Sequence, residues 1–240
     1  MGTILNNFYN LDFKESFEVQ INMKIYDILF GSREKSISLI IQEGNLDELK
    51  SFIKNGADVN GEYDGKSLLH FAIDNCEHNY VEVIEFLINS GADINSCQSY
   101  LHETPLHRLC ARITPKIDVV KLLLSKGAET NIENIAGKTP VFHCSFSYSV
   151  ELLNILVQYG ADVKHTDKYK NTILHDDYLN YTNGTFEEFL KVLISLGFDI
   201  NSKNNLGHTP LYLCKNKYVE KILLENGAEI SFPWWTSVPK

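Results

Sequence analysis

The sequence contains no long run of apolar residues. No stretch approaches the roughly 20 consecutive apolar residues that a membrane-spanning helix needs. The start, Met-Gly-Thr-Ile-Leu-Asn, also lacks the basic end and the small-residue cleavage site of a secretory signal. Gly2 suggests a myristoylation site, but Asn6 stands where that motif has serine or threonine. We therefore expect no membrane partner.

Dense blocks of basic residues are missing as well. The chain has 22 Lys and Arg against 31 Asp and Glu residues, which gives a formal net charge of -9. No segment concentrates enough positive charge to follow a phosphate backbone, so nucleic acid is not an expected partner. The five cysteines are scattered without CxxC pairing, which is typical of reduced thiols in the cytosol or nucleus. These features favour a cytoplasmic protein.

Motifs that carry catalysis or hold metals are also lacking. The sequence has no Gly-rich phosphate loop, no nucleophile elbow and no His-Glu-x-x-His helix. His102 and Cys110 would be one possible zinc pair, but no closely spaced second pair accompanies them. The paired acids Asp176-Asp177 and Glu187-Glu188 are interpreted as solvated or helix-start charges. We expect no enzyme, no catalytic residue, no metal and no cofactor.

The sequence does contain one phrase that recurs along its length. It reads Gly-Ala-Asp-Val-Asn or a close variant, and its glycines are separated by 35, 36, 33, 37 and 30 residues. This is the period of a helical repeat protein rather than of a single globular core. An apolar helical pattern precedes each phrase, so the glycine is expected to form a left-handed helix C-cap. These glycines are Gly56, Gly91, Gly127, Gly160, Gly197 and Gly227.

A second phrase opens the first helix of each repeat. The copies are Ser67-Leu-Leu-His70, Thr104-Pro-Leu-His107, Thr139-Pro-Val-Phe142, Thr172-Ile-Leu-His175 and Thr209-Pro-Leu-Tyr212. Serine or threonine can cap a helix start through its hydroxyl, and proline at the first helical position gives up only an amide that would be unpaired anyway.

Two such phrases in register resemble the ankyrin repeat with its Thr-Pro-Leu-His signature. The resemblance covers residues 36–230 and implies an all-α solenoid of about six helix-turn-helix repeats with protruding hairpin loops. It also implies that His70, His107 and His175 bond neighbouring backbone between repeats. Phe142 and Tyr212 depart from the motif histidine, and the sixth repeat is compressed near Lys215 to Tyr218.

Both ends of the chain lack the repeat phrases. Residues 1–35 are rich in apolar residues and are predicted to form an N-terminal capping segment, with a partner surface as the alternative. Residues 231–240 form a C-terminal tail with both tryptophans, which would cap the last repeat or anchor a partner. A further possibility is that the chain is the shortened form of a longer array.

The residues left free by stacking are candidates for protein binding. In ankyrin architecture these lie on the hairpin tips and on the inner ends of the first helices, where Arg112 and Phe146 fall. Aromatic anchors within a polar rim are typical of an interface. The predicted contact residues are Tyr63, Asp64, Lys66, Tyr100, Leu101, Glu103, Arg112, Ile135, Lys138, Phe146, Lys168, Tyr169, Asn171, Asn205, Leu206 and His208.

The uneven repeats and the many Asn, Ile, Lys and Tyr residues resemble poxvirus ankyrin proteins. That resemblance implies a host-range or immune-evasion factor that captures a host signalling protein of the NF-κB pathway or a necroptosis kinase. Relatives often carry a C-terminal F-box-like segment for a ubiquitin-ligase adaptor, and only ten residues follow Ile230 here. We expect a monomeric scaffold. The alternatives are a bacterial or cellular ankyrin adaptor without immune function and the substrate-positioning part of an enzyme.

Overall fold

The computed structural model of the chain describes residues 36–63, 65–97, 100–175 and 184–230. The expected N-terminal cap and C-terminal tail therefore lie outside the described residues. The chain divides into two compact units, Met1–Leu39 and Ile40–Lys240. Helix α2 (Ile37–Gln42) includes this boundary, and all elements from α3 onward belong to the second unit.

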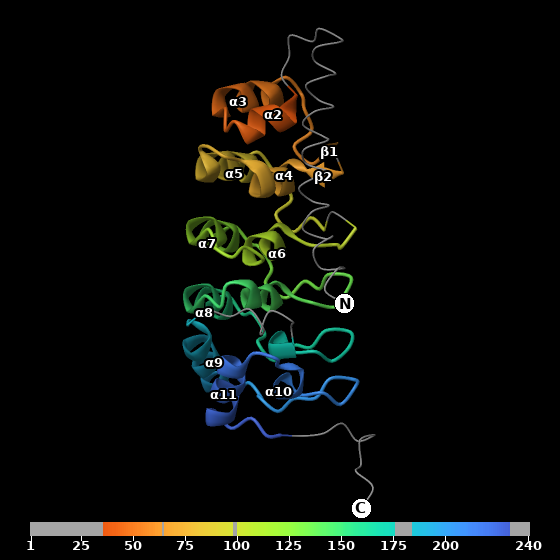
Figure 1. Cartoon of the computed structure of the whole chain (residues 1–240). Coiled ribbons are helices and arrows are strands. Elements are labelled where there is room, and N and C mark those ends of the chain that lie inside the picture. The colour runs from red at the N-terminus through yellow and green to blue at the C-terminus, as the bar shows by residue number, and fades with distance from the viewer. Residues whose placement is uncertain (1–35, 64, 98–99, 176–183, 231–240) are drawn as a thin grey trace, which may run out of the picture. The chain divides into compact units, whose positions relative to one another are not determined.

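Shorter and longer helices alternate along the described chain (Figure 1). The shorter elements are α4 (Leu68–Asn75), α6 (Pro105–Cys110), η1 (Pro140–Phe146), η2 (Ile173–His175) and α10 (Pro210–Leu213). The longer elements are α3 (Leu46–Lys54), α5 (Tyr80–Asn89), α7 (Ile117–Ser125), α8 (Val150–Gln158), α9 (Phe186–Ser195) and α11 (Lys217–Glu225). Among the described residues, strand structure is limited to the antiparallel pair β1 (Glu62–Tyr63) and β2 (Lys66–Ser67). The all-α repeat prediction is confirmed.

Side-chain caps start the shorter helices where the sequence places them. The hydroxyls of Ser67, Thr104 and Thr209 accept hydrogen bonds of 3.3, 3.4 and 3.3 Å from the amide three residues ahead. At the other end of each repeat, all six glycines of the recurring phrase have φ between 78° and 99°. A side chain with a Cβ is disfavoured there, so the predicted left-handed C-caps are confirmed.

The fourth and fifth repeats differ from the predicted α-helical opening. Their shorter elements, η1 and η2, are 3₁₀ helices. Thr139 makes no side-chain cap bond, and its buried Oγ1 has no hydrogen-bond partner in the described structure. In three other repeats the capping hydroxyl contacts Nδ1 of the motif histidine, whereas Phe142 offers no such atom.

The repeats stack as successive layers from α3 to α11 (Figure 1), and the side chains buried in the stack are mostly apolar. Along the row of shorter elements, α4 contacts α6, α6 contacts η1, η1 contacts η2, and η2 contacts α10. Leu106 and Leu109 of α6 and Leu123 of α7 are completely buried. The ring of Tyr148, just before α8, packs edge-on against Phe186 and Phe189 of α9, with ring centroids 5.3 and 5.4 Å apart.

Histidines tie successive repeats together. The Nε2 atoms of His70, His107 and His175 lie 2.9, 3.0 and 3.0 Å from the carbonyl oxygens of Glu103, Lys138 and His208 in the next repeat. The structural role expected for these histidines is therefore confirmed.

A second row of links is formed by asparagines. Asn131 Nδ2 donates to Gly160 O at 2.8 Å, and Asn131 Oδ1 accepts from Asp162 N at 3.0 Å. Asn60, Asn95 and Asn201 make the same pair of bonds to the next repeat. The corresponding position after Gly160 is Lys164, which carries donors but no acceptor and cannot reproduce the pair.

Candidate protein-binding surface

The hairpin loops of the last three repeats are held by one acidic or amide side chain each. Asn134 Oδ1 accepts hydrogen bonds from the amides of residues 136 and 138, and Asn204 Oδ1 does so from residues 206 and 208. Asp167 Oδ1 accepts from Tyr169 and Asn171, both at 2.8 Å. Because each loop supplies its own acceptor, its tip is ordered without a hydrophobic core.

Backbone hydrogen bonds join each of these loops to its neighbour. The amide of Ile135 donates to Leu101 O at 3.1 Å, and that of Lys168 donates to Ala136 O at 3.0 Å. The amide of Asn205 donates in turn to Tyr169 O at 2.9 Å. The loops from residue 100 to residue 208 therefore form one continuous edge, which we call the tip edge.

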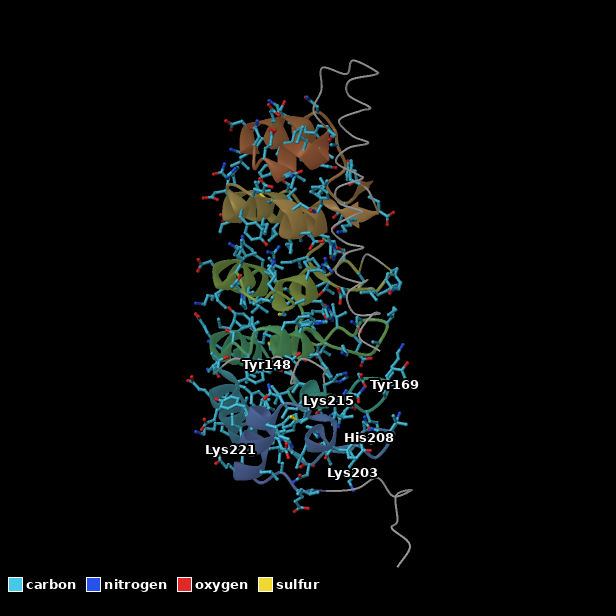
Figure 2. The ribbon with its side chains drawn as sticks, in the orientation of Figure 1. Tyr148, Tyr169, Lys203, His208, Lys215 and Lys221 are labelled. Carbon is cyan, nitrogen blue, oxygen red and sulfur yellow. The ribbon has the colours of Figure 1, made fainter. Side chains whose placement is uncertain are left out.

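Large apolar side chains project from the tip edge into solvent. The exposed fractions of Tyr100, Ile135, Tyr169 and Leu206 are 77%, 42%, 65% and 58%. Figure 2 shows Tyr169 at the end of its loop, away from the helices. Each of these four side chains therefore keeps a large exposed apolar surface.

The other predicted tip residues vary in exposure. Lys168 and Asn205 are exposed, and Lys138, Asn171 and His208 are half-buried. The ring of His208 stacks on Tyr212, with ring centroids 4.4 Å apart. Tyr63 is also half-buried, and its hydroxyl donates to Asp58 O at 3.3 Å. Asp64 lies outside the described residues.

Glu103 is not a tip contact residue, contrary to the sequence-based prediction. Its exposed fraction is only 5%, and its Oε2 lies 3.5 Å from the guanidinium of Arg108. Its Oε1 lies 3.4 Å from His143 Nε2, but burial and nearby His107, Lys138 and Arg108 lower the pKa of His143 to about 3. His143 is therefore neutral at pH 7, and Arg108 is the charged partner that makes burial of this carboxylate tolerable.

Lys66 is occupied by an internal ion pair. Its Nζ lies 2.8 Å from Asp74 Oδ2, and Arg108 contacts the same carboxylate at 3.0 and 3.1 Å. Burial alone would raise the pKa of Asp74, but Arg108 and Lys66 outweigh it and the pKa is lowered. This cluster ties the loop before α4 to α6 and leaves Lys66 less available than its tip position suggested.

The inner helix ends are also more internally engaged than the sequence indicated. Arg112 donates to Ile73 O, and its guanidinium lies 5.8 Å from the centre of the Tyr80 ring. Phe146, at one of these ends, is half-buried, and its ring centroid lies 5.7 Å from that of His143. Leu101, predicted to be exposed on a hairpin tip, is also half-buried. Such contacts depend on how neighbouring repeats pack, which the repeat register alone does not specify.

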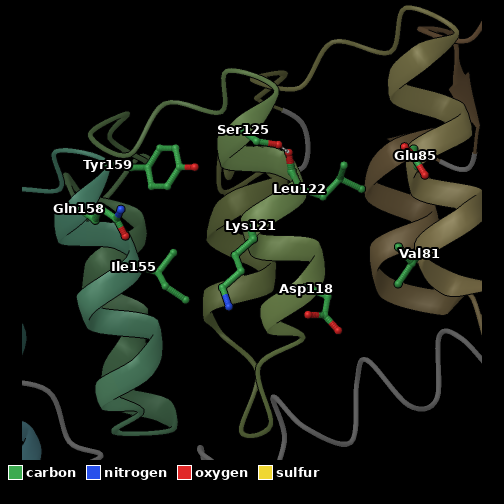
Figure 3. Close-up of a pocket in the computed structure, with 9 residues that line it drawn as sticks. All are labelled: Val81, Glu85, Asp118, Lys121, Leu122, Ser125, Ile155, Gln158 and Tyr159. Carbon is green, nitrogen blue, oxygen red and sulfur yellow. Dashed lines mark hydrogen bonds between the residues drawn. The ribbon is translucent and has the colours of Figure 1, made fainter.

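A second surface, on the outer row of helices, was missed by the sequence argument. Val81 of α5, Leu122 of α7 and Ile155 of α8 line an open depression of about 490 Å³ together with Tyr159 (Figure 3). The remaining lining residues are Glu85, Asp118, Lys121, Ser125 and Gln158. The signal that could have found it is Tyr159, an aromatic residue directly before the glycine C-cap, which is 45% exposed.

The described residues contain no group of three or more His, Cys, Asp or Glu side chains placed to hold a metal ion. All five cysteines are free thiols, and burial raises the pKa of Cys144 well above its ordinary value. No helix within the described ranges is long and apolar enough to cross a bilayer.

Comparisons with known proteins agree with this architecture. A family model described as ankyrin repeats (3 copies) matches residues 17–98 and 106–176. A putative ankyrin repeat protein of fowlpox virus is 32% identical over 168 residues, which cover 68% of this chain and 84% of that protein. An ankyrin repeat protein of variola virus is 28% identical over 239 residues, which cover 89% of this chain and 41% of that protein.

A relative outside the viruses is also similar. The BRCA1-associated RING domain protein 1 of Caenorhabditis elegans is 40% identical over 113 residues, which cover 46% of this chain and 15% of that protein. The matches to the worm and variola relatives thus span less than half of their length. Ankyrin repeats are an interaction module, and nothing in the described residues points to catalysis. The family model covers more than half of this chain, so the protein belongs to the ankyrin repeat family and is a scaffold for protein–protein interaction.

Proposed function

We propose that this protein is a viral factor that captures a host signalling protein in the host cytoplasm through its tip edge. The observation that carries the proposal is the row of exposed apolar side chains at Tyr100, Ile135, Tyr169 and Leu206, presented on hydrogen-bonded loops. Preordered loops lose little conformational freedom on binding, which favours affinity. The similarity to fowlpox and variola ankyrin repeat proteins supports a viral role.

The family resemblance suggests two classes of target, an NF-κB pathway protein and a necroptosis kinase. Capture would inhibit the target or present it for ubiquitin-dependent degradation. In such relatives an F-box-like segment that follows the repeats recruits the ubiquitin-ligase adaptor. The alternative is a bacterial or cellular adaptor without immune function.

Affinity capture from infected-host lysate tests the proposal. The double variant Tyr100→Ala and Tyr169→Ala is expected to lose the captured signalling protein, because truncation of central aromatic anchors costs on the order of 1 to 4 kcal/mol of binding each. Both side chains are largely exposed, so the melting temperature should change little.

Tyr159→Ala is the matched control, since this tyrosine is exposed on the outer row of helices rather than on the tip edge. It is expected to retain the captured protein. If Tyr159→Ala releases the target and the tip variant keeps it, the binding surface is the outer depression and the proposal is wrong. Recovery of only housekeeping proteins would favour the adaptor alternative.

A further inference from the structure

The loops of the fifth and sixth repeats, residues 164–171 and 201–208, are basic although the whole chain carries a net charge of -9. They contain Lys164, Lys168, Lys170 and Lys203, and all four side chains are exposed. None of these ammonium groups is ion-paired with a carboxylate of the described residues. The one acid within the two loops, Asp167, is buried, and its carboxylate accepts hydrogen bonds from the amides of its own loop.

The earlier hairpin loops, before α4 and before η1, do not share this charge. The loop before α4 contains Glu62 and Asp64 besides Lys66, whose ammonium is paired with Asp74. In the loop before η1, the exposed Glu133 lies 3.7 Å from His165. Positive charge is therefore concentrated at one end of the tip edge. The exposed acids Asp162 and Asp199 precede the two basic loops. The other repeats also have an acid at this position, so these acids do not change the difference in charge between the basic loops and the earlier loops.

Two of the four lysines occupy positions where the fold favours another residue. Lys170 has φ of +57°, in the left-handed region, and the same loop position is glycine in three other repeats, with φ of 73°, 77° and 73°. A lysine carries a steric penalty there that glycine avoids. Lys164 replaces the asparagine that elsewhere makes two hydrogen bonds to the next repeat. Departures from a local structural rule of this kind are expected where a residue serves function.

Apolar side chains lie among these charges. Tyr169 is flanked in sequence by Lys168 and Lys170, and Leu206 is presented by the adjacent loop. The two loops are joined by the hydrogen bond from Asn205 N to Tyr169 O and by a 2.9 Å bond from Asn204 Nδ2 to Asn171 Oδ1. In Figure 2, Tyr169, Lys203 and His208 mark these neighbouring loops.

We infer that these two loops dock an acidic peptide segment of the partner protein, one that carries an apolar side chain between carboxylates. The lysines supply charge complementarity, and Tyr169 and Leu206 supply apolar contact area. The inference rests on the proposed function and specifies which partner chemistry the C-terminal end of the tip edge selects. Four lysines on an acidic protein are few for tracking a phosphate backbone, which disfavours a nucleic acid as the ligand.

Selection of random 12-residue peptides displayed on phage against the full chain tests the inference. The enriched peptides should contain aspartate or glutamate around a leucine or an aromatic residue. Their synthetic fluorescein-labelled forms should bind more weakly as salt is raised, because exposed charge pairs are screened. Glutamine and asparagine analogues of the same peptides should bind more weakly than the acidic originals.

The variant that isolates the site combines Lys164→Asn with Lys170→Gly. Both changes bring the chain to the residue used in other repeats, so the variant should melt at or above the wild-type temperature. It should nevertheless bind the acidic peptides about fivefold more weakly, as expected from the loss of two exposed charge pairs. A loss of binding without loss of stability cannot be attributed to unfolding.

Lys54→Gln combined with Lys221→Gln is the control, because it removes the same net charge from α3 and α11, away from these loops. It should leave peptide affinity within about twofold of wild type, since surface charge remote from a site acts weakly at physiological salt. If both double variants weaken peptide binding equally, the lost net charge explains the weakening and the inference is wrong. Selection of neutral peptides would also overturn it, as would preferential binding of a 12-nucleotide single strand of DNA.

The inference and the proposed function fail separately. If peptides show no dependence on Lys164 and Lys170 but target capture still requires Tyr100, only the docking inference is lost. If capture requires neither Tyr100 nor Tyr169, the tip-edge proposal itself is lost.

Discussion

At the scale of single residues, the capping threonines show that one neighbouring side chain determines whether a buried hydroxyl stabilises the fold. Thr104 Oγ1 contacts both the amide and Nδ1 of His107, at 3.4 and 2.8 Å. Thr139 stands at the same repeat position but faces Phe142, and its hydroxyl is buried without a partner in the described structure. A buried hydroxyl that forms no hydrogen bond costs free energy rather than contributing it.

We therefore expect opposite outcomes from the same substitution at the two positions. Thr104→Val should lower the free energy of unfolding by about 1 to 2 kcal/mol, because a cap and a bond to the histidine are lost. Thr139→Val should leave it unchanged or raise it by up to about 1 kcal/mol, because only an unsatisfied group is removed. Urea denaturation measures both. Equal losses at both sites would show that Thr139 has a partner, such as a water molecule.

The residue scale is also where the sequence predicted least well. Tyr100, Ile135, Tyr169 and Leu206 follow from the register alone, since a turn tip has no core to bury them. The burial of Glu103 does not follow, because it depends on Arg108, five residues later in α6, and on His143 in the next repeat. Contacts between repeats are set by side-chain packing, which a repeat phrase does not encode.

At the scale of elements, the two recurring phrases predicted where most helices begin and end. The glycine C-caps and the starts of α4, α6 and α10 agree with them. The phrases did not predict that η1 and η2 would be 3₁₀ helices. In η1, phenylalanine stands at position 142 in place of the motif histidine. The histidine hydrogen bond to the next repeat is therefore absent, and the hydroxyl of Thr139 has no partner in the described structure. The asparagine link between α8 and α9 is missing as well, at Lys164. Both polar links are thus absent from the same junction.

Restoring one link should stabilise that junction. Lys164→Asn is expected to raise the free energy of unfolding by about 1 kcal/mol, because two hydrogen bonds to the repeat of α9 would form at an exposed site. Asn131→Lys, which deletes the equivalent pair one repeat earlier, should lower it by a similar amount. Hydrogen exchange of the amides in α9 should slow in the first variant. Unchanged exchange together with unchanged stability would count against a structural role for this row of asparagines.

At the scale of the whole repeat stack, stability is shared among neighbours, because each repeat buries its apolar face only against the adjacent ones. The buried histidines of successive repeats belong to this shared interface. Burial lowers the pKa of His107 to about 4, and burial with nearby positive groups lowers that of His143 to about 3. Burial also lowers the pKa of His70 and His175. All four imidazoles are therefore neutral in the folded protein at pH values where they would take up a proton in the unfolded chain.

This difference predicts that the stack loses stability as the pH falls from about 6.5 toward 4, since the unfolded state binds more protons across that range. The stabilisation is fully present above pH 6.5, and each histidine can contribute a slope of up to about 1.4 kcal/mol per pH unit. Between pH 6.5 and 5 the carboxylates remain largely ionised, so the histidines dominate the slope.

Chemical denaturation at a series of pH values measures this slope, and one variant assigns it. His143→Met fills a similar volume without a titrating group, and it should reduce the slope between pH 6.5 and 5 by up to about 1.4 kcal/mol per pH unit. His78→Gln, which removes an exposed histidine and keeps the four buried imidazoles, is the comparison variant. A slope that stays the same in His143→Met would mean that His143 already takes up its proton in the folded state, which its proximity to Glu103 at 3.4 Å would then explain.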